Sequence, residues 1–247
     1  MKHLLWWLCL FVAPAVLIAI ELFHPAGFTT SPGMYQFLSH AETAHEHAAL
    51  AYFGPQWWFT LHMIQTPMVG LVAVGLWLMV DGIGAKDGTA ARVAAWLARA
   101  AIFVFALTFT ILDAIGGIGL GRTLLVVQEL VTGGKLSPAQ LDGVVLLLNT
   151  LWVDPVVGGV GSFVSETASW AAFAVSFLVA AALLLSGRAG WANMIVLLGF
   201  GWELQTAHAS PHGPIAFGLL IVAAGWLWWA RRRASVGQPG VAKVGTA

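Results

Sequence analysis

The chain has few charged residues, one cysteine and no excess of either charge. Charged residues make up 9% of its 247 positions, whereas a soluble domain carries roughly 25%, so the composition excludes an ordinary soluble globular protein. The 11 basic and 11 acidic residues balance, which gives no indication of a nucleic-acid partner. Because Cys9 is the only cysteine, an internal disulfide, a thiol pair and a cysteine-based zinc site are excluded.

Apolar residues dominate the sequence instead. Hydrophobic residues make up 59% of the chain, 13 residues are tryptophan, and the mean hydropathy is +0.85. Several apolar runs are about 20 residues long, which is the length that a helix needs to cross a hydrocarbon core. We therefore predict an all-α, polytopic membrane bundle with a single membrane domain over residues 1–233. The small, polar tail over 234–247 is predicted to be disordered.

Six apolar runs are predicted to span the membrane. They are Leu4–Phe23, Trp57–Val80, Val93–Leu120, Ala168–Leu185, Trp191–Ala207 and Ile215–Ala230. The run at 141–161 has only about a dozen apolar residues before Asp154-Pro155, which favours a re-entrant or interfacial segment over a seventh span. The segment 33–50 has helical character and an apolar side, so we expect it to lie on the membrane surface.

The distribution of lysine and arginine favours six spans over seven. With six spans, one side of the membrane holds Lys2, Lys86, Arg92, Arg188 and Arg231–Arg233. The other side holds only Arg122 and Lys135, together with the loop 26–55, which contains no basic residue other than histidine. Basic residues concentrate in cytoplasmic loops. The pattern therefore predicts a multi-pass protein of the cell membrane with both termini in the cytoplasm.

Eight histidine and carboxyl side chains in or beside the predicted spans fall in the extracytoplasmic half. They are Glu21, His24, His62, Asp113, Glu166, Glu203, His208 and His212. Such groups are costly at membrane depth, and their default interpretation is functional. The alternative is a structural hydrogen-bonded network. The glycine-rich stretch 116–121, which follows Asp113, would permit close contact between helices.

Two spacings among these residues are typical of metal ligands. Glu21 and His24 have the Glu-x-x-His spacing that places two ligands on one helix face. His208 and His212 have the i, i+4 spacing of a two-histidine metal face, although Pro211 indicates that a helix ends there. Imidazole and carboxylate ligands together suit zinc, iron or copper.

The leading hypothesis is therefore a metal-dependent membrane enzyme, an oxidoreductase or a hydrolase, acting on a lipid-like or apolar substrate. The expected metal ligands are His62, His208, His212, Glu203, Glu21 and His24. Asp113 or Glu166 would act as general acid or base. The bilayer and an apolar small molecule are the expected partners, and an oligomer or a partner subunit stays open.

Three alternatives remain at this point. A haem or quinone electron carrier would use two of the four histidines at 24, 62, 208 and 212 as axial ligands. A proton- or cation-coupled transporter would use Asp113 and Glu203 as binding sites. A non-catalytic subunit would use the tryptophan-rich and glycine-rich faces for packing.

Overall fold

The computed structural model describes residues 2–24, 54–159 and 161–236, in which every regular element is a helix. In chain order these are α1 (Lys2–Trp7), the π-helical turn η1 (Leu8–Val12), α2 (Ala13–Glu21), α5 (Pro55–Met79), the 3-10 turn η2 (Ala85–Asp87), α6 (Thr89–Leu112), the π-helical turn η3 (Asp113–Gly119), α7 (Leu120–Thr132), α8 (Pro138–Trp152), α9 (Phe163–Leu185), α10 (Trp191–Thr206) and α11 (His212–Val236). The all-α prediction is confirmed for these residues. The helix expected over 33–50 lies outside them.

Five helical stretches are long and apolar enough to cross a membrane. They are Lys2–Glu21, Pro55–Met79, Thr89–Thr132, Phe163–Leu185 and His212–Arg233. The remaining predicted span corresponds to α10, which has 16 residues, fewer than the about 20 that a perpendicular crossing takes. With 15 residues, α8 is also short. The described part of the chain is thus a helical bundle in which five helices have the length and apolar composition of membrane spans.

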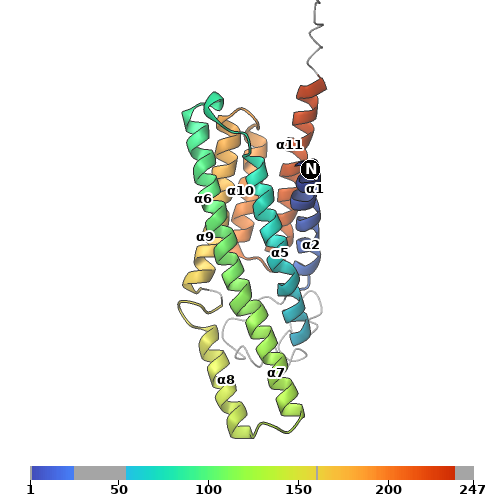
Figure 1. Ribbon diagram of the computed structural model, residues 1–247, viewed down its shortest axis with the longest axis vertical. Coiled ribbons are helices and arrows are strands. Elements are labelled where there is room, and N and C mark those ends of the chain that lie inside the picture. Colours follow the sequence, from blue (N-terminus) through green and yellow to red (C-terminus); the bar gives the residue numbers. More distant parts are fainter. Residues whose placement is uncertain (1, 25–53, 160, 237–247) are drawn as a thin grey trace, which may run out of the picture.

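Six helical segments form a closed ring in the bundle, since each packs against two others of the set. The order around the ring is α2, α5, α6, α9, α10, α11 and back to α2. Neighbours in the ring run antiparallel, because the chain reverses direction between successive members. The start of α1 and the end of α11 therefore lie at the same end of the bundle (Figure 1). We call it the basic end, because Lys2, Arg188 and Arg231 lie there.

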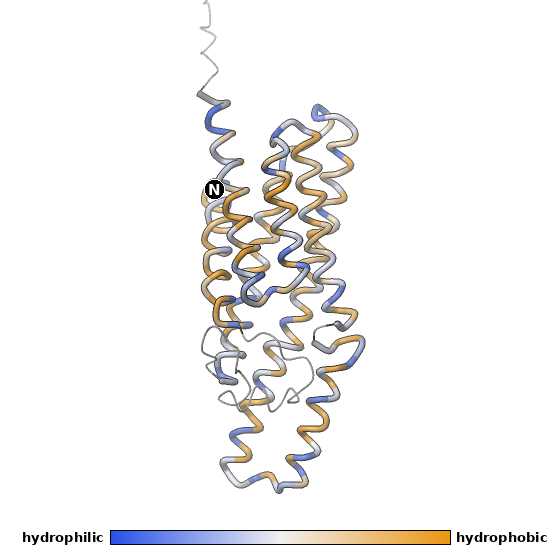
Figure 2. The backbone as a smooth tube through the Cα atoms, turned by 180° about the vertical axis from the view of Figure 1, so that it is seen from behind, coloured by the Kyte–Doolittle hydropathy of each residue, from blue (hydrophilic) through white to orange (hydrophobic). Residues whose placement is uncertain are grey.

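Small side chains allow the helices to approach closely. On α6, Ala91, Ala94, Ala95 and Ala98 are buried, and α9 contributes a similar series of buried alanines. Small residues at helix interfaces are the usual means of close packing in membranes. The outer surface is also apolar, since large side chains such as Trp96 and Phe103 are exposed. Figure 2 shows hydrophobic residues along most of the bundle and a strongly hydrophilic stretch near the end of α11.

The segments α6, η3 and α7 form one helical stretch of 44 residues. At 1.5 Å per residue it measures about 66 Å, roughly twice the thickness of a hydrocarbon core. Its second half leaves the bundle and pairs with α8 (Figure 1). Leu124, Val127 and Leu148 are buried there against Trp58 of α5. The predicted span ending at Leu120 therefore continues, because the glycine-rich stretch forms a π-helical turn instead of a helix end.

Candidate functional site

Buried polar side chains gather at the end of the bundle opposite the basic end. Glu21, His24, His62, Gln65 and Asp113 are each at most 8% exposed. Glu21 and His24 lie at the end of α2, His62 and Gln65 lie in the first three turns of α5, and Asp113 begins η3. The loop 207–211 between α10 and α11 adds a further histidine at position 208.

Two tryptophan side chains hold these segments together. The indole N–H of Trp57 donates a hydrogen bond to the carbonyl of Phe23, at 2.9 Å. The indole N–H of Trp58 donates to the carbonyl of Gly116 in η3, at 3.1 Å. The start of α5 is thereby tied both to the end of α2 and to the π-helical turn.

Three imidazole rings, those of His24, His62 and His208, form what we call the histidine cluster. The ring centre of His24 lies 5.3 Å from that of His62 and 4.9 Å from that of His208. The ring of Trp58 packs 4.6 Å from His62, and the ring of Phe109 packs 5.6 Å from His208. Burial lowers the pKa of His208, which lies outside the spanning helices, from 6.5 to about 4. That ring is therefore neutral near pH 7.

The hydrogen bond of His62 defines its tautomer. Its Nδ1 lies 2.7 Å from the backbone carbonyl oxygen of Trp58. A carbonyl only accepts hydrogen bonds, so Nδ1 carries the proton and donates it. In a neutral ring, Nε2 then keeps its lone pair for another partner. Metal-binding histidines usually have this arrangement, with the second ring nitrogen donating to a carbonyl or carboxylate.

A glycine in η3 provides the space for the ring of His62. A Cβ atom placed on Gly117 would lie only 2.2 Å from that ring. Contacts this short do not occur between real Cβ atoms and their neighbours, so no larger residue fits without displacing the histidine. The glycine-rich sequence indicates close helix contact, and the structure identifies the buried imidazole as the group in contact.

Two buried side chains lack hydrogen-bond partners within the described residues. Both carboxyl oxygens of Glu21 and both amide atoms of Gln65 are unpartnered, and each side chain is 0% exposed. Leaving one buried polar group unsatisfied costs about 1–3 kcal/mol. Glu21 is also close enough to Asp113 to interact with it electrostatically. A bound cation or polar ligand would satisfy the unpartnered atoms and would offset the interaction between the two carboxyl groups.

Asp113 and a backbone carbonyl accept hydrogen bonds from the same hydroxyl group, that of Thr66. The hydroxyl of Thr66 lies 3.1 Å from Oδ2 of Asp113 and 2.9 Å from the carbonyl oxygen of His62. A threonine hydroxyl has one proton, so these two acceptors compete for it. The carboxyl group therefore retains the capacity to accept a proton or contact a cation. His62, Gln65 and Thr66 occupy one helix face at i, i+3 and i+4, a signal readable in the sequence.

Glu203 and His212 form a separate pair. Oε2 of Glu203 lies 2.7 Å from Nδ1 of His212, and the two side chains are 25% and 38% exposed. Because α10 ends at Thr206 and α11 begins at His212, the histidine at position 208 lies in the intervening loop. The predicted two-histidine face at 208 and 212 is therefore not formed on one helix.

Glu166 also stands apart from the cluster. It is exposed in the first turn of α9, where a carboxylate stabilises the positive end of the helix dipole. Of the eight predicted site residues, the structure gathers five, Glu21, His24, His62, Asp113 and His208. Trp58 and Phe109 pack against rings of the cluster, and the sequence pattern does not identify either of them as part of the site.

The described ranges contain no group of three histidine, cysteine, aspartate or glutamate side chains already arranged to hold a metal ion. Metal binding would therefore require side-chain rotation at the cluster. His24 and His208 both lie outside helices, His24 just after α2 and His208 in the loop before α11. Rotation of these two is less restricted than rotation of a side chain packed within a helix.

An apolar groove lies on the outer side of the contact between α5 and η3. It has a volume of about 510 Å³, and its lining includes Phe59, Met63, Ile118, Arg122 and Val126. Met63 and Ile118 directly follow the buried His62 and Gly117 in sequence. The groove therefore lies on the same two helical segments as the contact between His62 and Gly117.

No protein-family model, curated protein or solved structure matches the chain.

Proposed function

We propose that this chain is an integral membrane protein that binds a transition-metal ion at the histidine cluster and uses it in catalysis. The observation that carries the proposal is the meeting of three imidazoles, of which those of His24 and His62 are buried, at the end of α2, where the buried carboxyl group of Glu21 has no hydrogen-bond partner among the described residues. Imidazole and carboxylate ligands suit zinc, iron and copper. A bound cation would also offset the cost of burying that carboxyl group.

The three rings are close enough to form one donor set. The ring centre of His24 lies 5.3 Å from that of His62 and 4.9 Å from that of His208. After rotation of His24 and His208, ring nitrogens of these two residues and Nε2 of His62 would be available to the same ion.

The surrounding residues suit distinct roles in such a site. His24, His62, His208 and Glu21 are the proposed ligands. The carbonyl that accepts the proton of His62 orients that ring. When bound, the metal would supply Lewis-acid or redox chemistry. Asp113, with its shared hydroxyl donor, would accept or release a proton as the general acid or base.

The apolar groove beside the cluster favours a lipid-like substrate. Its lining is almost entirely apolar, with Arg122 as a cationic residue. A long apolar chain would bury hydrophobic surface in this groove, and an anionic group at its end would pair with the guanidinium. Entry from the side would bring such a substrate against η3, the segment that begins at Asp113 and supports the ring of His62.

A membrane topology with six crossings and cytoplasmic termini forms part of the proposal. The closed ring of six segments supports counting α10 as a crossing despite its length. The basic end holds both the start of α1 and the end of α11. Its cations, including Lys2, Arg188 and Arg231, suit the cytoplasmic side. The histidine cluster would then face the extracytoplasmic side.

Metal analysis of the purified full-length protein tests the proposal. We expect about one equivalent of zinc, iron or copper per chain, as isolated or after reconstitution with each metal. His24→Ala, His62→Ala and His208→Ala should each lose most of it. His212→Ala is the matched control and should retain it, because Nδ1 of this residue pairs with the carboxylate of Glu203.

Two outcomes would overturn the proposed metal site. One is wild-type protein that stays substoichiometric in every metal after reconstitution. The other is metal that is retained in the three cluster variants and lost only in His212→Ala, since this would place the ion at the pair with Glu203. Circular dichroism of each variant separates a lost ligand from a lost fold.

A further inference from the structure

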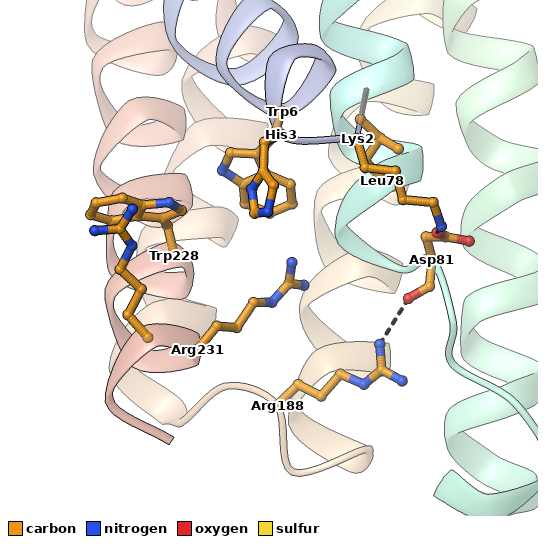
Figure 3. Close-up of a pocket in the computed structure, with 9 residues that line it drawn as sticks. Lys2, His3, Trp6, Leu78, Asp81, Arg188, Trp228 and Arg231 are labelled. Carbon is orange, nitrogen blue, oxygen red and sulfur yellow. Dashed lines mark hydrogen bonds and ion pairs between the residues drawn. The ribbon is translucent and has the colours of Figure 1, made fainter. Parts of the chain in front are cut away.

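A second pocket lies at the basic end, between the start of α1 and the ends of α5 and α11 (Figure 3). It has a volume of about 380 Å³, and its lining includes Lys2, Trp6, Asp81, Arg188, Arg231 and Arg232. It shares no residue with the histidine cluster, so the two sites are independent of each other.

Positive charge exceeds negative charge in the lining of this pocket. Four of its residues are lysine or arginine, and Asp81 is its one carboxylate. Lys2 donates a hydrogen bond to that carboxylate at 2.9 Å. The pairing holds the pKa of Asp81 below its usual value, which keeps the group ionised. Among the residues that line the pocket, Asp81 is therefore the one carboxylate that faces Arg231, and it is already paired with Lys2.

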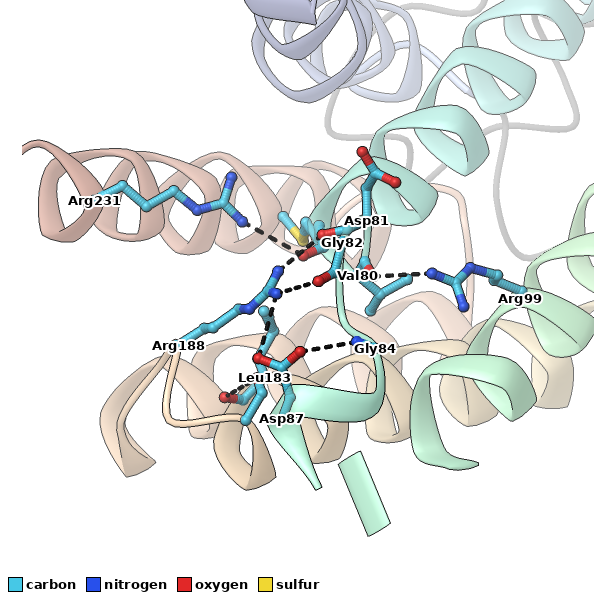
Figure 4. Close-up of polar contacts among 11 residues, drawn as sticks. Val80, Asp81, Gly82, Gly84, Asp87, Arg99, Leu183, Arg188 and Arg231 are labelled. Atoms are coloured by element: carbon cyan, nitrogen blue, oxygen red, sulfur yellow. Dashed lines mark hydrogen bonds and ion pairs between the residues drawn. The ribbon is translucent and has the colours of Figure 1, made fainter. Parts of the chain in front are cut away.

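Arg188 has a structural role in the pocket wall (Figure 4). Its guanidinium donates to the backbone carbonyl of Asp81 at 2.8 Å and to that of Gly82. It also contacts the carboxylate of Asp87 at 3.4 Å. These contacts use its donors to hold the loop after α5 against the bundle. The capacity to bind an anion therefore lies with Arg231 and with the ammonium protons of Lys2 that Asp81 does not accept.

Arg231 and Arg232 lie against aromatic rings. The guanidinium of Arg231 lies 4.7 Å from the ring centre of Trp6, and that of Arg232 lies 3.9 Å from the ring centre of Trp228. A stacked guanidinium keeps the N–H groups on its edge available for an acceptor. Arg231 donates to the carbonyl of Met79 at 3.4 Å, longer than the usual 2.9–3.0 Å of such bonds.

The indole of Trp6 provides a second, independent indication of a ligand. Its side chain is only 7% exposed, and its N–H has no hydrogen-bond acceptor among the described residues. A buried donor without an acceptor is costly. Trp6 lines the pocket, so an anion there that carries several acceptor oxygens would pair with the guanidinium of Arg231 and, once the indole turns toward it, would accept the indole N–H as well.

We propose that this pocket binds a phosphate-bearing anion through Lys2, Arg231 and the indole N–H of Trp6. A phosphate group offers several acceptor oxygens and pairs with a guanidinium through two parallel hydrogen bonds. The pocket lies where three helices end, and its tryptophans suit the interface between headgroups and hydrocarbon. A phospholipid headgroup and a soluble phosphate share this chemistry.

Thermal unfolding of the full-length protein in maltoside micelles, followed by circular dichroism, tests the proposal. The additives are phosphatidylglycerol, phosphatidylcholine with the same acyl chains, and inorganic phosphate. We expect phosphatidylglycerol to raise the midpoint and phosphatidylcholine to have little effect, because ligand binding to the folded state stabilises it. If inorganic phosphate alone has the effect, the ligand is a soluble phosphate. Stabilisation by phosphatidylglycerol or by inorganic phosphate would each support binding of a phosphate-bearing anion in this pocket.

Variants connect the effect to the pocket. Arg231→Gln should weaken phosphatidylglycerol binding about tenfold, the loss expected for a charged hydrogen bond. Arg231→Lys should retain part of the binding and covers the case in which the glutamine variant does not fold. Trp6→Phe removes only the indole N–H and should also weaken binding. The control is Arg233→Gln, because Arg233 stacks on Trp229 and does not line the pocket.

Two results would overturn the proposal. In the first, neither phosphatidylglycerol nor inorganic phosphate changes the midpoint of the wild-type protein. In the second, Arg231→Gln and Trp6→Phe respond as the wild type does, which would place the bound anion elsewhere.

Discussion

The contact between Gly117 and His62 allows a sharp test of the histidine cluster. In Gly117→Ala, the added methyl group would lie 2.2 Å from the imidazole, whereas ordinary contacts begin at 3.4 Å. The ring must therefore move by about 1.2 Å, or η3 must move away from α5. Crowding of this kind in a packed interior costs typically 1–3 kcal/mol.

The expected consequence for metal binding is larger than that for stability. A ligand bond of about 2.0–2.1 Å tolerates only a few tenths of an ångström. A shift of about 1 Å would detach His62 from an ion that its neighbours still hold. We expect metal affinity to fall at least 10- to 100-fold, the range seen when the support of a ligand is lost.

The neighbouring glycine supplies the matched control. A Cβ atom on Gly116 would meet Trp152 at 3.8 Å, an ordinary contact. Gly116→Ala should therefore keep wild-type metal affinity, with stability unchanged or raised by up to about 1 kcal/mol. Both variants are measured by competition with a metal chelator and by unfolding in detergent. Equal metal affinity in the two variants would refute the role assigned to His62.

Three further predictions concern other parts of the fold. Asn193→Ala removes a buried hydrogen bond of 3.0 Å to the carbonyl of Ala223 and should cost about 0.6–1.7 kcal/mol in detergent unfolding; an unchanged midpoint would contradict this. Lys2→Gln removes an exposed partner of Asp81 and should cost less than about 1 kcal/mol. Because Lys2 lowers the pKa of Asp81, the difference in stability between wild type and variant should be present above about pH 4. It should vanish as the pH falls through the lowered pKa of Asp81. A difference in stability that does not depend on pH would count against the ion pair. Ser137→Ala removes the N-cap of α8 and should speed amide exchange in its first turn about fivefold, as for a loss of about 1 kcal/mol, with α9 as the internal reference.

Much of the helical architecture follows from the sequence. A helix in a membrane satisfies its backbone hydrogen bonds within itself, so an apolar run of sufficient length predicts a helix without knowledge of its neighbours. The predicted span beginning at Trp191 corresponds to a helix with that same first residue. The run predicted to end at Leu120 is extended to Thr132. A π-helical turn carries the helix through the glycines, and its formation depends on packing against α5.

The composition of the candidate site is partly a property of the sequence and partly of the tertiary structure. The cost of burying ionisable groups identifies histidines and carboxyl groups in the spans as candidates from sequence alone. Their grouping depends on the rotation of each helix about its axis and on the order of helices in the ring. Packing decides both. His208 and His212 are four residues apart in sequence, yet the first contacts His24 while the second pairs with Glu203.

The sequence by itself therefore determined the class of the protein, its helices and the set of residues available for chemistry, because apolar length and the cost of buried charge are local properties. Only the tertiary structure decided that the imidazoles of His24, His62 and His208 meet while Glu166 stays exposed. It also assigned Gly117 to the support of His62 and gathered the cations of the basic end around Trp6. These contacts join segments far apart in the chain, and they exist only once the ring of helices has closed.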